Sequence, residues 1–129
     1  MTPTPPSISE AEWSVMEVLW DRHPRTAAEV VEALDGDRRW SPRTVKTLLA
    51  RLVKKGALTA EEDGPRYRYA PRVSRDECVL AEGQSFRERF FKGRTSPLLQ
   101  HFVEQGELSA DDIARLRALL DERSKEVSE

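Results

Sequence analysis

The sequence predicts a mainly α-helical protein with one small β-hairpin near its middle. Signals for helix starts recur along the chain, and apolar residues follow most of them at helical spacing. Between two short β-prone runs, Asp63-Gly64 has the composition of a hairpin turn. With 129 residues, of which 34% are charged and 38% hydrophobic, the chain is long enough for one domain and an extension.

The first helix is expected to begin after Ser9, behind a short disordered leader formed by residues 1–7. Ser9 and Glu12 have the spacing of a capping box, in which each side chain accepts a hydrogen bond from the other residue's backbone N–H. Apolar residues recur at helical spacing from Trp13 to Trp20. The helix should end near His23, because the residue before a proline avoids helical backbone angles.

Two more helices are predicted before the hairpin. One should begin at the capping box that starts with Thr26 and should end at Gly36. The other should begin at Ser41-Pro42, an N-cap followed by proline at the first helical position, and should end at Gly56. Its buried face should hold residues at the i, i+3, i+4 and i+7 spacing, namely Val45, Leu48, Leu49 and Leu52.

Three helices followed by a β-hairpin are the element order of a winged helix-turn-helix, which we therefore predict for residues 8–72. In residues 73–129, helix starts are expected at Ser74, Ser96-Pro97 and Ser109. These helices have too few apolar residues to close a core alone, so we predict a helical dimerisation region that packs against a second copy. The residues expected at the dimer seam are Val79, Phe86, Phe90, Leu99, Phe102, Val103, Ile113, Leu116 and Leu120.

Basic residues are concentrated in the middle third of a chain whose net charge is −2. Residues 1–37 have a net charge of −6, residues 38–72 of +7, and residues 73–129 of −3. From Trp40 to Gly56 there are five basic residues and no acidic one, so ion pairs along the helix do not account for the charge. Because a phosphate senses charge within a Debye length of about 10 Å, this local excess favours binding to nucleic acid.

The exposed side of the third helix is therefore predicted to bind double-stranded DNA in the major groove, where the first turns of a helix meet base edges. The residues expected to read bases are Arg43, Thr44, Lys46 and Thr47. Those expected to hold mainly phosphates are Ser41, Arg51, Lys54, Lys55, Arg66 and Arg68. Two alternatives remain: the basic side chains could bind an acidic protein partner, or they could form a merely solvated surface.

Beyond these patterns, the chain resembles the penicillinase repressors, the BlaI/MecI type of bacterial transcription regulator, along nearly its whole length. The resemblance rests on ISEAEWSVMEVLW, WSPRTVKTLLARLVKKG, the YRY after the hairpin turn, and LLQHFVEQGELSADDIARLRALL. It implies a homodimeric repressor whose C-terminal helices contact the partner and whose operators contain inverted TACA and TGTA elements. It also implies DNA contacts by residues that match the family's recognition helix, namely Ser41, Arg43, Thr44, Lys46, Thr47 and Arg51.

The resemblance also names a candidate cleavage site. In the best-known members a membrane sensor-protease system responds to β-lactams, and the repressor is cut between an asparagine and a phenylalanine. The aligned pair here is His101-Phe102, which keeps the phenylalanine and lacks the asparagine. A regulatory protease is therefore a candidate partner, and a β-lactam resistance gene is a candidate target. A copper-sensing branch has paired C-x-C motifs, whereas this chain has only Cys78.

Other classes of function are not predicted. The consecutive acids 61–63 have no accompanying nucleophile or base, so we expect no enzyme activity. Two histidines and one cysteine, far apart in the sequence, do not have metal-ligand spacing, so we expect no metal and no cofactor. The N-terminus does not have the pattern of a secretory signal, and the longest apolar run is too short to cross a membrane. The chain is expected to act in the reducing cytoplasm.

Overall fold

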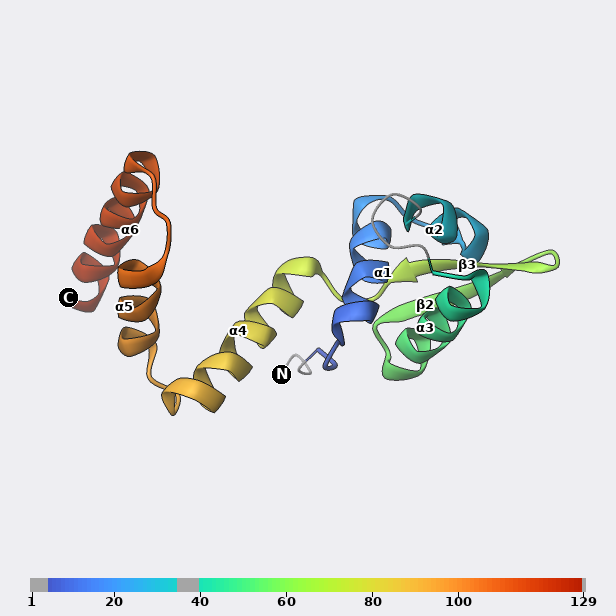
Figure 1. Cartoon of the computed structure of the whole chain (residues 1–129), viewed down its shortest axis with the longest axis horizontal. Helices are drawn as coiled ribbons and strands as arrows, with labels where there is room; N and C mark the ends of the chain where they lie inside the picture. Colours follow the sequence, from blue (N-terminus) through green and yellow to red (C-terminus); the bar gives the residue numbers. More distant parts are fainter. Residues whose placement is uncertain (1–4, 35–39, 129) are drawn as a thin grey trace. The chain divides into compact units, whose positions relative to one another are not determined.

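A computed structural model describes residues 5–34 and 40–128 of the chain. The elements are α1 (Glu10–Asp21), β1 (Arg25–Thr26), α2 (Ala27–Leu34), α3 (Pro42–Lys55), β2 (Leu58–Asp63), β3 (Arg66–Pro71), α4 (Arg75–Phe91), α5 (Thr95–Gln105) and α6 (Ala110–Ser128) (Figure 1). The predicted fold class, mainly α with a small hairpin in a winged helix, is confirmed. Gly36, the predicted end of the second helix, lies outside the described residues.

The chain divides into two compact units, which we call the N-terminal unit (residues 1–85) and the C-terminal unit (residues 86–129). The N-terminal unit holds α1 to α3, the sheet and the first part of α4. The C-terminal unit holds the end of α4 together with α5 and α6.

Capping boxes begin α1 and α2 as predicted. The backbone N–H of Ser9 donates to Glu12 Oε1 at 2.9 Å, and the N–H of Glu12 donates to Ser9 Oγ at 3.2 Å. Thr26 and Glu29 exchange the same two bonds at 3.0 and 3.3 Å. These bonds satisfy N–H groups that have no partner within the helix, so the starts of both helices are determined by residues close in sequence.

The ends of α3 also follow the prediction. Ser41 Oγ accepts a hydrogen bond from the N–H of Thr44 at 3.1 Å, and Pro42 occupies the first turn. Gly56 ends the helix in the left-handed region, at φ 86°, where a residue without Cβ is favoured. The recognition helix of the predicted motif therefore has defined ends of its own.

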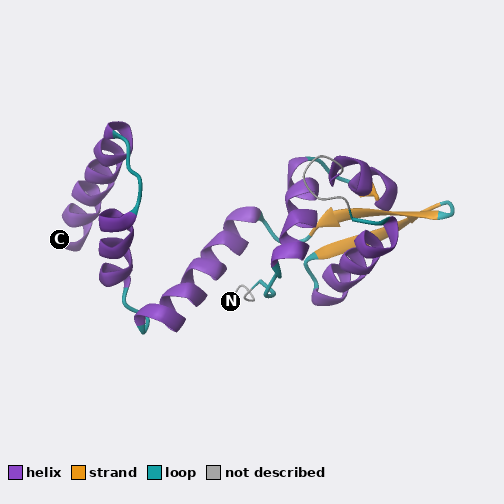
Figure 2. Cartoon of the chain, in the orientation of Figure 1, coloured by secondary structure: helices purple, strands orange, loops and turns teal. Residues whose placement is uncertain are grey.

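The sheet has three antiparallel strands in the order β1-β3-β2 (Figure 2). Strands β2 and β3 pair from Leu58 opposite Pro71 to Asp63 opposite Arg66, around the predicted turn. Strand β1 was not expected from the sequence, because its two residues show no β pattern and their partners on β3 are distant in the chain. In Figure 1 the hairpin extends past the helices of the N-terminal unit, as a wing does.

The core of the N-terminal unit is closed by apolar residues from α1, α2, α3, β2 and α4. The predicted inner face of α3 is 0–5% exposed, and Cys78 on α4 is 1% exposed. Trp20 Nε1 donates to the carbonyl of Val73 at 2.9 Å, which joins α1 to the segment before α4. These contacts favour a domain boundary later than the one predicted between residues 72 and 73, which itself stays a prediction.

The C-terminal unit has no comparable core. No residue of α5 or α6 is buried. The rings of Phe86 and Phe90 are 4.8 Å apart between centroids, and those of Phe86 and Phe102 are 6.1 Å apart. Helix α6 begins after the predicted cap at Ser109, whereas α5 begins at Thr95, ahead of the predicted start, with no side-chain cap.

Candidate nucleic-acid interface

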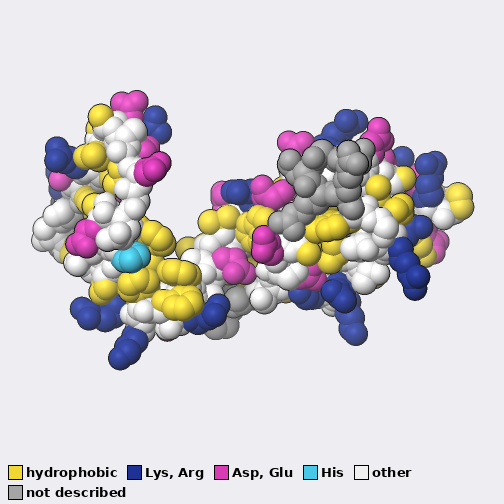
Figure 3. All heavy atoms as spheres, viewed as in Figure 1, with side chains coloured by type: hydrophobic (Ala, Val, Ile, Leu, Met, Phe, Trp, Pro, Cys, Tyr) yellow, Lys and Arg dark blue, Asp and Glu magenta, His cyan; other side chains and the backbone are white. Residues whose placement is uncertain are grey.

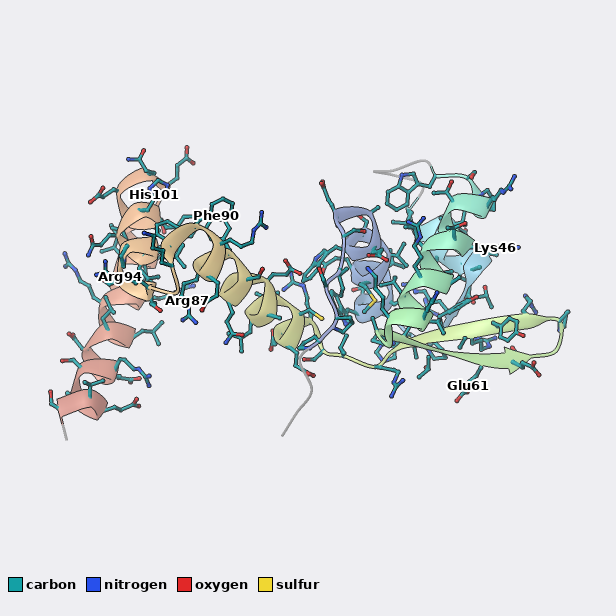
Figure 4. The ribbon with its side chains drawn as sticks, turned by 90° about the horizontal axis from the view of Figure 1, so that it is seen from below. Lys46, Glu61, Arg87, Phe90, Arg94 and His101 are labelled. Atoms are coloured by element: carbon teal, nitrogen blue, oxygen red, sulfur yellow. The ribbon has the colours of Figure 1, made fainter. Side chains whose placement is uncertain are left out.

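One side of α3 presents a row of cations and hydroxyls, because its apolar residues face the core. We call this row the basic face, and it comprises Arg43, Thr44, Lys46, Thr47, Arg51 and Lys54, all exposed. None of its four cations pairs with a side chain elsewhere in the described part of the chain. Figure 3 shows basic side chains projecting around α3 and the hairpin, and Figure 4 shows Lys46 on the outer side of α3. This charge is available to an external anion.

The hydroxyls at the start of α3 are partly occupied by the helix itself. Ser41 Oγ caps the helix and lies 3.0 Å from Thr44 Oγ1. Thr47 Oγ1 donates to the carbonyl of Arg43 at 3.0 Å, so this hydroxyl can only accept from a further group. Both threonines are exposed, and a threonine methyl group is able to contact a thymine methyl in the major groove.

Lys55 contacts a buried carboxylate of the fold, so its predicted contact with phosphate, which stays a prediction, is less favoured than that of Lys54. Its Nζ donates to Glu12 Oε1 and to the carbonyl of Ser7 at 3.0 Å. Glu12 is 2% exposed. Burial works to raise the pKa of Glu12, but hydrogen bonds from Lys55 and Ser9 outweigh it and hold that pKa below its ordinary value. The sequence contains both partners but gives no signal that they meet.

The two arginines of the hairpin differ in their ion pairing, although the sequence predicted the same role for both. Arg68 Nε donates to Asp63 Oδ2 at 2.7 Å and lies opposite Glu61 on β2. This bond and the charge of Arg68 lower the pKa of Asp63. Arg66 has no ion-pair partner within the described residues. Arg66 is therefore the freer cation, although the strand register places it directly opposite Asp63.

A cleft of about 420 Å³ lies where the hairpin meets β1, the first turn of α2 and Lys46 of α3. It is lined by the first turn of α2 and by Lys46, Pro65, Arg66, Tyr67 and Tyr69. Burial raises the pKa of Tyr69, so its hydroxyl stays protonated at neutral pH. Sequence reasoning missed both tyrosines. Strand alternation could have indicated them, because they lie on the same sheet face as buried Leu58.

The residues predicted for the dimer seam are all exposed in this single chain, by 39–60%. His101 and Phe102 both lie inside α5, so the candidate cleavage bond is helical. The His101 ring is 6.2 Å from that of Phe91 and 6.0 Å from that of Phe102. Figure 4 labels His101 on α5.

Residues 5–34 and 40–128 contain neither the pattern of a metal-binding cluster nor that of a membrane-spanning helix. No group of three or more His, Cys, Asp or Glu side chains there is arranged to hold a metal ion. No helix in that part of the chain has both the length and the apolarity needed to span a membrane.

The chain matches known proteins along most of its length. The model of the family described as "Penicillinase repressor" matches residues 8–122. The penicillinase repressor of Bacillus licheniformis is 34% identical over 124 residues, which cover 96% of this chain and 97% of that protein. The methicillin resistance regulatory protein MecI of Mammaliicoccus sciuri is 34% identical over 116 residues, covering 90% and 94%.

Solved structures support the fold. The solution structure of the DNA binding domain of the repressor BlaI is 38% identical, with a TM-score of 0.52, and the match covers 60% of this chain and 93% of that one. The YusO protein from Bacillus subtilis, at 13% identity and a TM-score of 0.51 over 92% of this chain and 75% of its own, shares the fold alone. The family model, the sequence relatives and the BlaI domain agree with one another. The chain therefore belongs to the penicillinase repressor family.

Proposed function

We propose that this chain is a sequence-specific transcriptional repressor that binds an inverted-repeat operator as a homodimer. The observation that carries the proposal is the basic face, whose four cations have no acidic partner among the described residues. The face lies on the third helix of a winged helix, the element that enters the major groove in such domains. The charge neutralises phosphates, and the early residues of the helix supply groups that distinguish bases.

The early and later turns of α3 have different roles in the proposed complex. Arg43, Thr44 and Thr47 lie in its first two turns and face base edges in the proposed complex. Arg51 and Lys54 lie in its later turns and hold phosphates, as does Arg66 on the wing. Arg68, which is already bound to Asp63, contributes less.

Homodimer formation is supported by the C-terminal unit. Its apolar side chains include Phe90 at 60% and Leu120 at 60% exposure, an apolar surface that a monomer leaves in contact with water. A second copy is the partner that buries it symmetrically. Two recognition helices would then meet half-sites one helical turn, about 34–36 Å, or a small multiple apart.

We further propose that the repressor controls a β-lactam resistance gene and is released from DNA by proteolysis. Members named for penicillinase and for methicillin resistance support a β-lactam resistance gene as the target. A protease that cuts between His101 and Phe102 would have to unwind α5 locally, because both residues are helical. Action on DNA places the protein in the cytoplasm. Intact repressor in cells exposed to a β-lactam, measured by mass, would contradict the cleavage.

Fluorescence anisotropy with labelled duplexes tests the central proposal. The full-length protein should bind a duplex carrying inverted TACA and TGTA elements far more tightly than a scrambled duplex of equal length. Its affinity should fall steeply with salt, since each neutralised phosphate adds about 0.9 to the slope of log K against log salt. Equal, weak binding to both duplexes would contradict the proposal and would favour an acidic protein as the partner.

A further inference from the structure

Three side chains with hydrogen-bond donors line the cleft where the hairpin meets α2 and α3, namely Lys46, Arg66 and Tyr69. The ammonium of Lys46 and the guanidinium of Arg66 can only donate, and neither pairs with a group in the described residues. The hydroxyl of Tyr69 has no bonding partner there either. No carboxylate is among the residues that line the cleft. Such a lining complements a group that only accepts hydrogen bonds and is negatively charged, and a phosphate is such a group.

The cleft is too large for a bare ion. Its volume of about 420 Å³ falls in the range of about 300–1,000 Å³ that is typical of sites for organic ligands. The residues of α2 at its wall, Ala27 and Ala28, have small side chains that leave this space open. A phosphate together with its sugar is the smallest phosphate-bearing unit of DNA that would use the volume.

The geometry of a duplex explains why the backbone would enter here. A single sugar-phosphate strand separates each major groove from the neighbouring minor groove. If α3 lies in the major groove and the wing reaches the next groove, that strand must pass between α3 and the hairpin. The cleft lies beside the hairpin and is bounded by Lys46 on α3 and by the first turn of α2, and Lys46 belongs both to the cleft and to the basic face.

We infer that this cleft holds one sugar-phosphate unit of the strand between the two grooves, bound by Lys46, Arg66 and Tyr69. The inference rests on the proposed function and deepens it. It assigns Lys46 to the DNA backbone, whereas the sequence predicted that Lys46 reads a base. It adds Tyr69, for which neither the residue patterns nor the family resemblance predicted a contact with DNA.

Methylphosphonate scanning tests the inference, because a methylphosphonate removes the charge of one chosen phosphate. Duplexes with the inverted TACA and TGTA elements would each carry one neutral linkage, and full-length wild type, Lys46→Gln, Arg66→Gln and Tyr69→Phe would be titrated with all of them. One linkage position in each half-site should weaken wild-type binding about tenfold. At that position or its neighbour, Lys46→Gln and Arg66→Gln should each lose much of this sensitivity, and Tyr69→Phe should lose less, because its two cations remain.

The same variants have a second readout. Lys46→Gln should lower the salt slope by about 0.9 for each subunit bound and should weaken operator and scrambled duplexes by the same factor. Tyr69→Phe removes one neutral hydroxyl, so it should weaken binding several-fold with the slope unchanged. Lys54→Gln is the matched control, since it removes a cation of the same face outside the cleft and should respond to a different linkage.

Three results would overturn the inference while leaving the proposed function intact. Lys46→Gln could change the preference among base-substituted operators at an unchanged salt slope, which would make Lys46 a base reader. The three variants could map to unrelated linkages. Inorganic phosphate alone could bind the DNA-free protein at micromolar concentration, which would assign the cleft to a small anion. If wild type failed to distinguish operator from scrambled DNA, the proposed function itself would fail as well.

Discussion

The two units of this chain differ in where their apolar side chains are placed. In the N-terminal unit the inner face of α3 is 0–5% exposed, whereas no residue of α5 or α6 in the C-terminal unit is buried. Both units contain amphipathic helices, and both include a helix that begins with a side-chain cap, α1 at Ser9 and α6 at Ser109. The difference shows that one unit completes its core from its own residues, while the other leaves apolar side chains exposed, as the proposed dimer requires.

Removal of the C-terminal unit is the strongest way to test this comparison. A fragment of residues 1–85 keeps Cys78 in its core and the bond from Trp20 to Val73, so it should fold and remain monomeric. Its affinity for the inverted repeat should fall by about 10²–10⁴-fold, because two half-sites would no longer bind as one linked unit. Circular dichroism would check that the fragment folds, sedimentation that it is monomeric, and anisotropy that its affinity has fallen. An unfolded fragment would contradict the idea that this core is complete.

A matched pair of leucine truncations sharpens the same contrast. Leu49→Ala, at a side chain that is 0% exposed, should destabilise the N-terminal unit by about 2–5 kcal/mol. Leu120→Ala, at a side chain that is 60% exposed, should leave the unfolding of that unit unchanged within about 0.5 kcal/mol. It should instead raise the dimer dissociation constant at least tenfold. Denaturant unfolding and sedimentation equilibrium separate these outcomes, and equal effects of the two variants would refute the distinction.

The Glu12–Lys55 pair predicts a pH dependence confined to the N-terminal unit. The folded pKa of Glu12 lies below its ordinary value of 4.5, so the pair stabilises the fold above pH 4.5 and stops doing so as pH falls through the folded pKa. Glu12→Gln should cost about 1–3 kcal/mol at pH 7. Its stability should then change less than that of wild type between pH 4.5 and more acidic values. Parallel stability curves for the two proteins would contradict the assignment.

The sequence predicted the parts of the fold that depend on neighbouring residues. The boxes at Ser9 and Thr26, the cap at Ser41 and the hairpin turn all use bonds within a few residues. Strand β1 could not be predicted, because it is a strand only through its pairing with β3, whose residues are distant in the sequence.

For the site, the sequence identified which residues of α3 are exposed but not what they contact. Lys54 and Lys55 are adjacent and chemically identical, yet only Lys55 meets a buried carboxylate. Arg66 and Arg68 differ because only Arg68 is bonded to Asp63. The cleft with Tyr69 depends on the approach of α3 to the hairpin, which is a tertiary contact without a local signal.

The smallest expected effects are changes in the salt dependence of DNA binding when Arg51 or Arg68 is replaced. Arg51→Gln should lower the salt slope by about 0.9 for each phosphate that is no longer neutralised, and it should weaken all duplexes alike. Arg68→Gln should change the slope by much less, because the Arg68 charge is already offset by Asp63. Anisotropy titrations at several salt concentrations would measure both slopes. A larger change for Arg68 than for Arg51 would reverse the proposed ranking of the two arginines.

The basic face is tested most directly by a map of the residues that respond to DNA. Backbone amide resonances of the full-length protein would be followed by NMR during titration with the duplex that carries the inverted TACA and TGTA elements. We predict that the largest shifts fall on residues 41–54 of α3 and on the hairpin turn at residues 63–67. Shifts confined to α1 or α6, with α3 unaffected at saturation, would contradict the proposed interface.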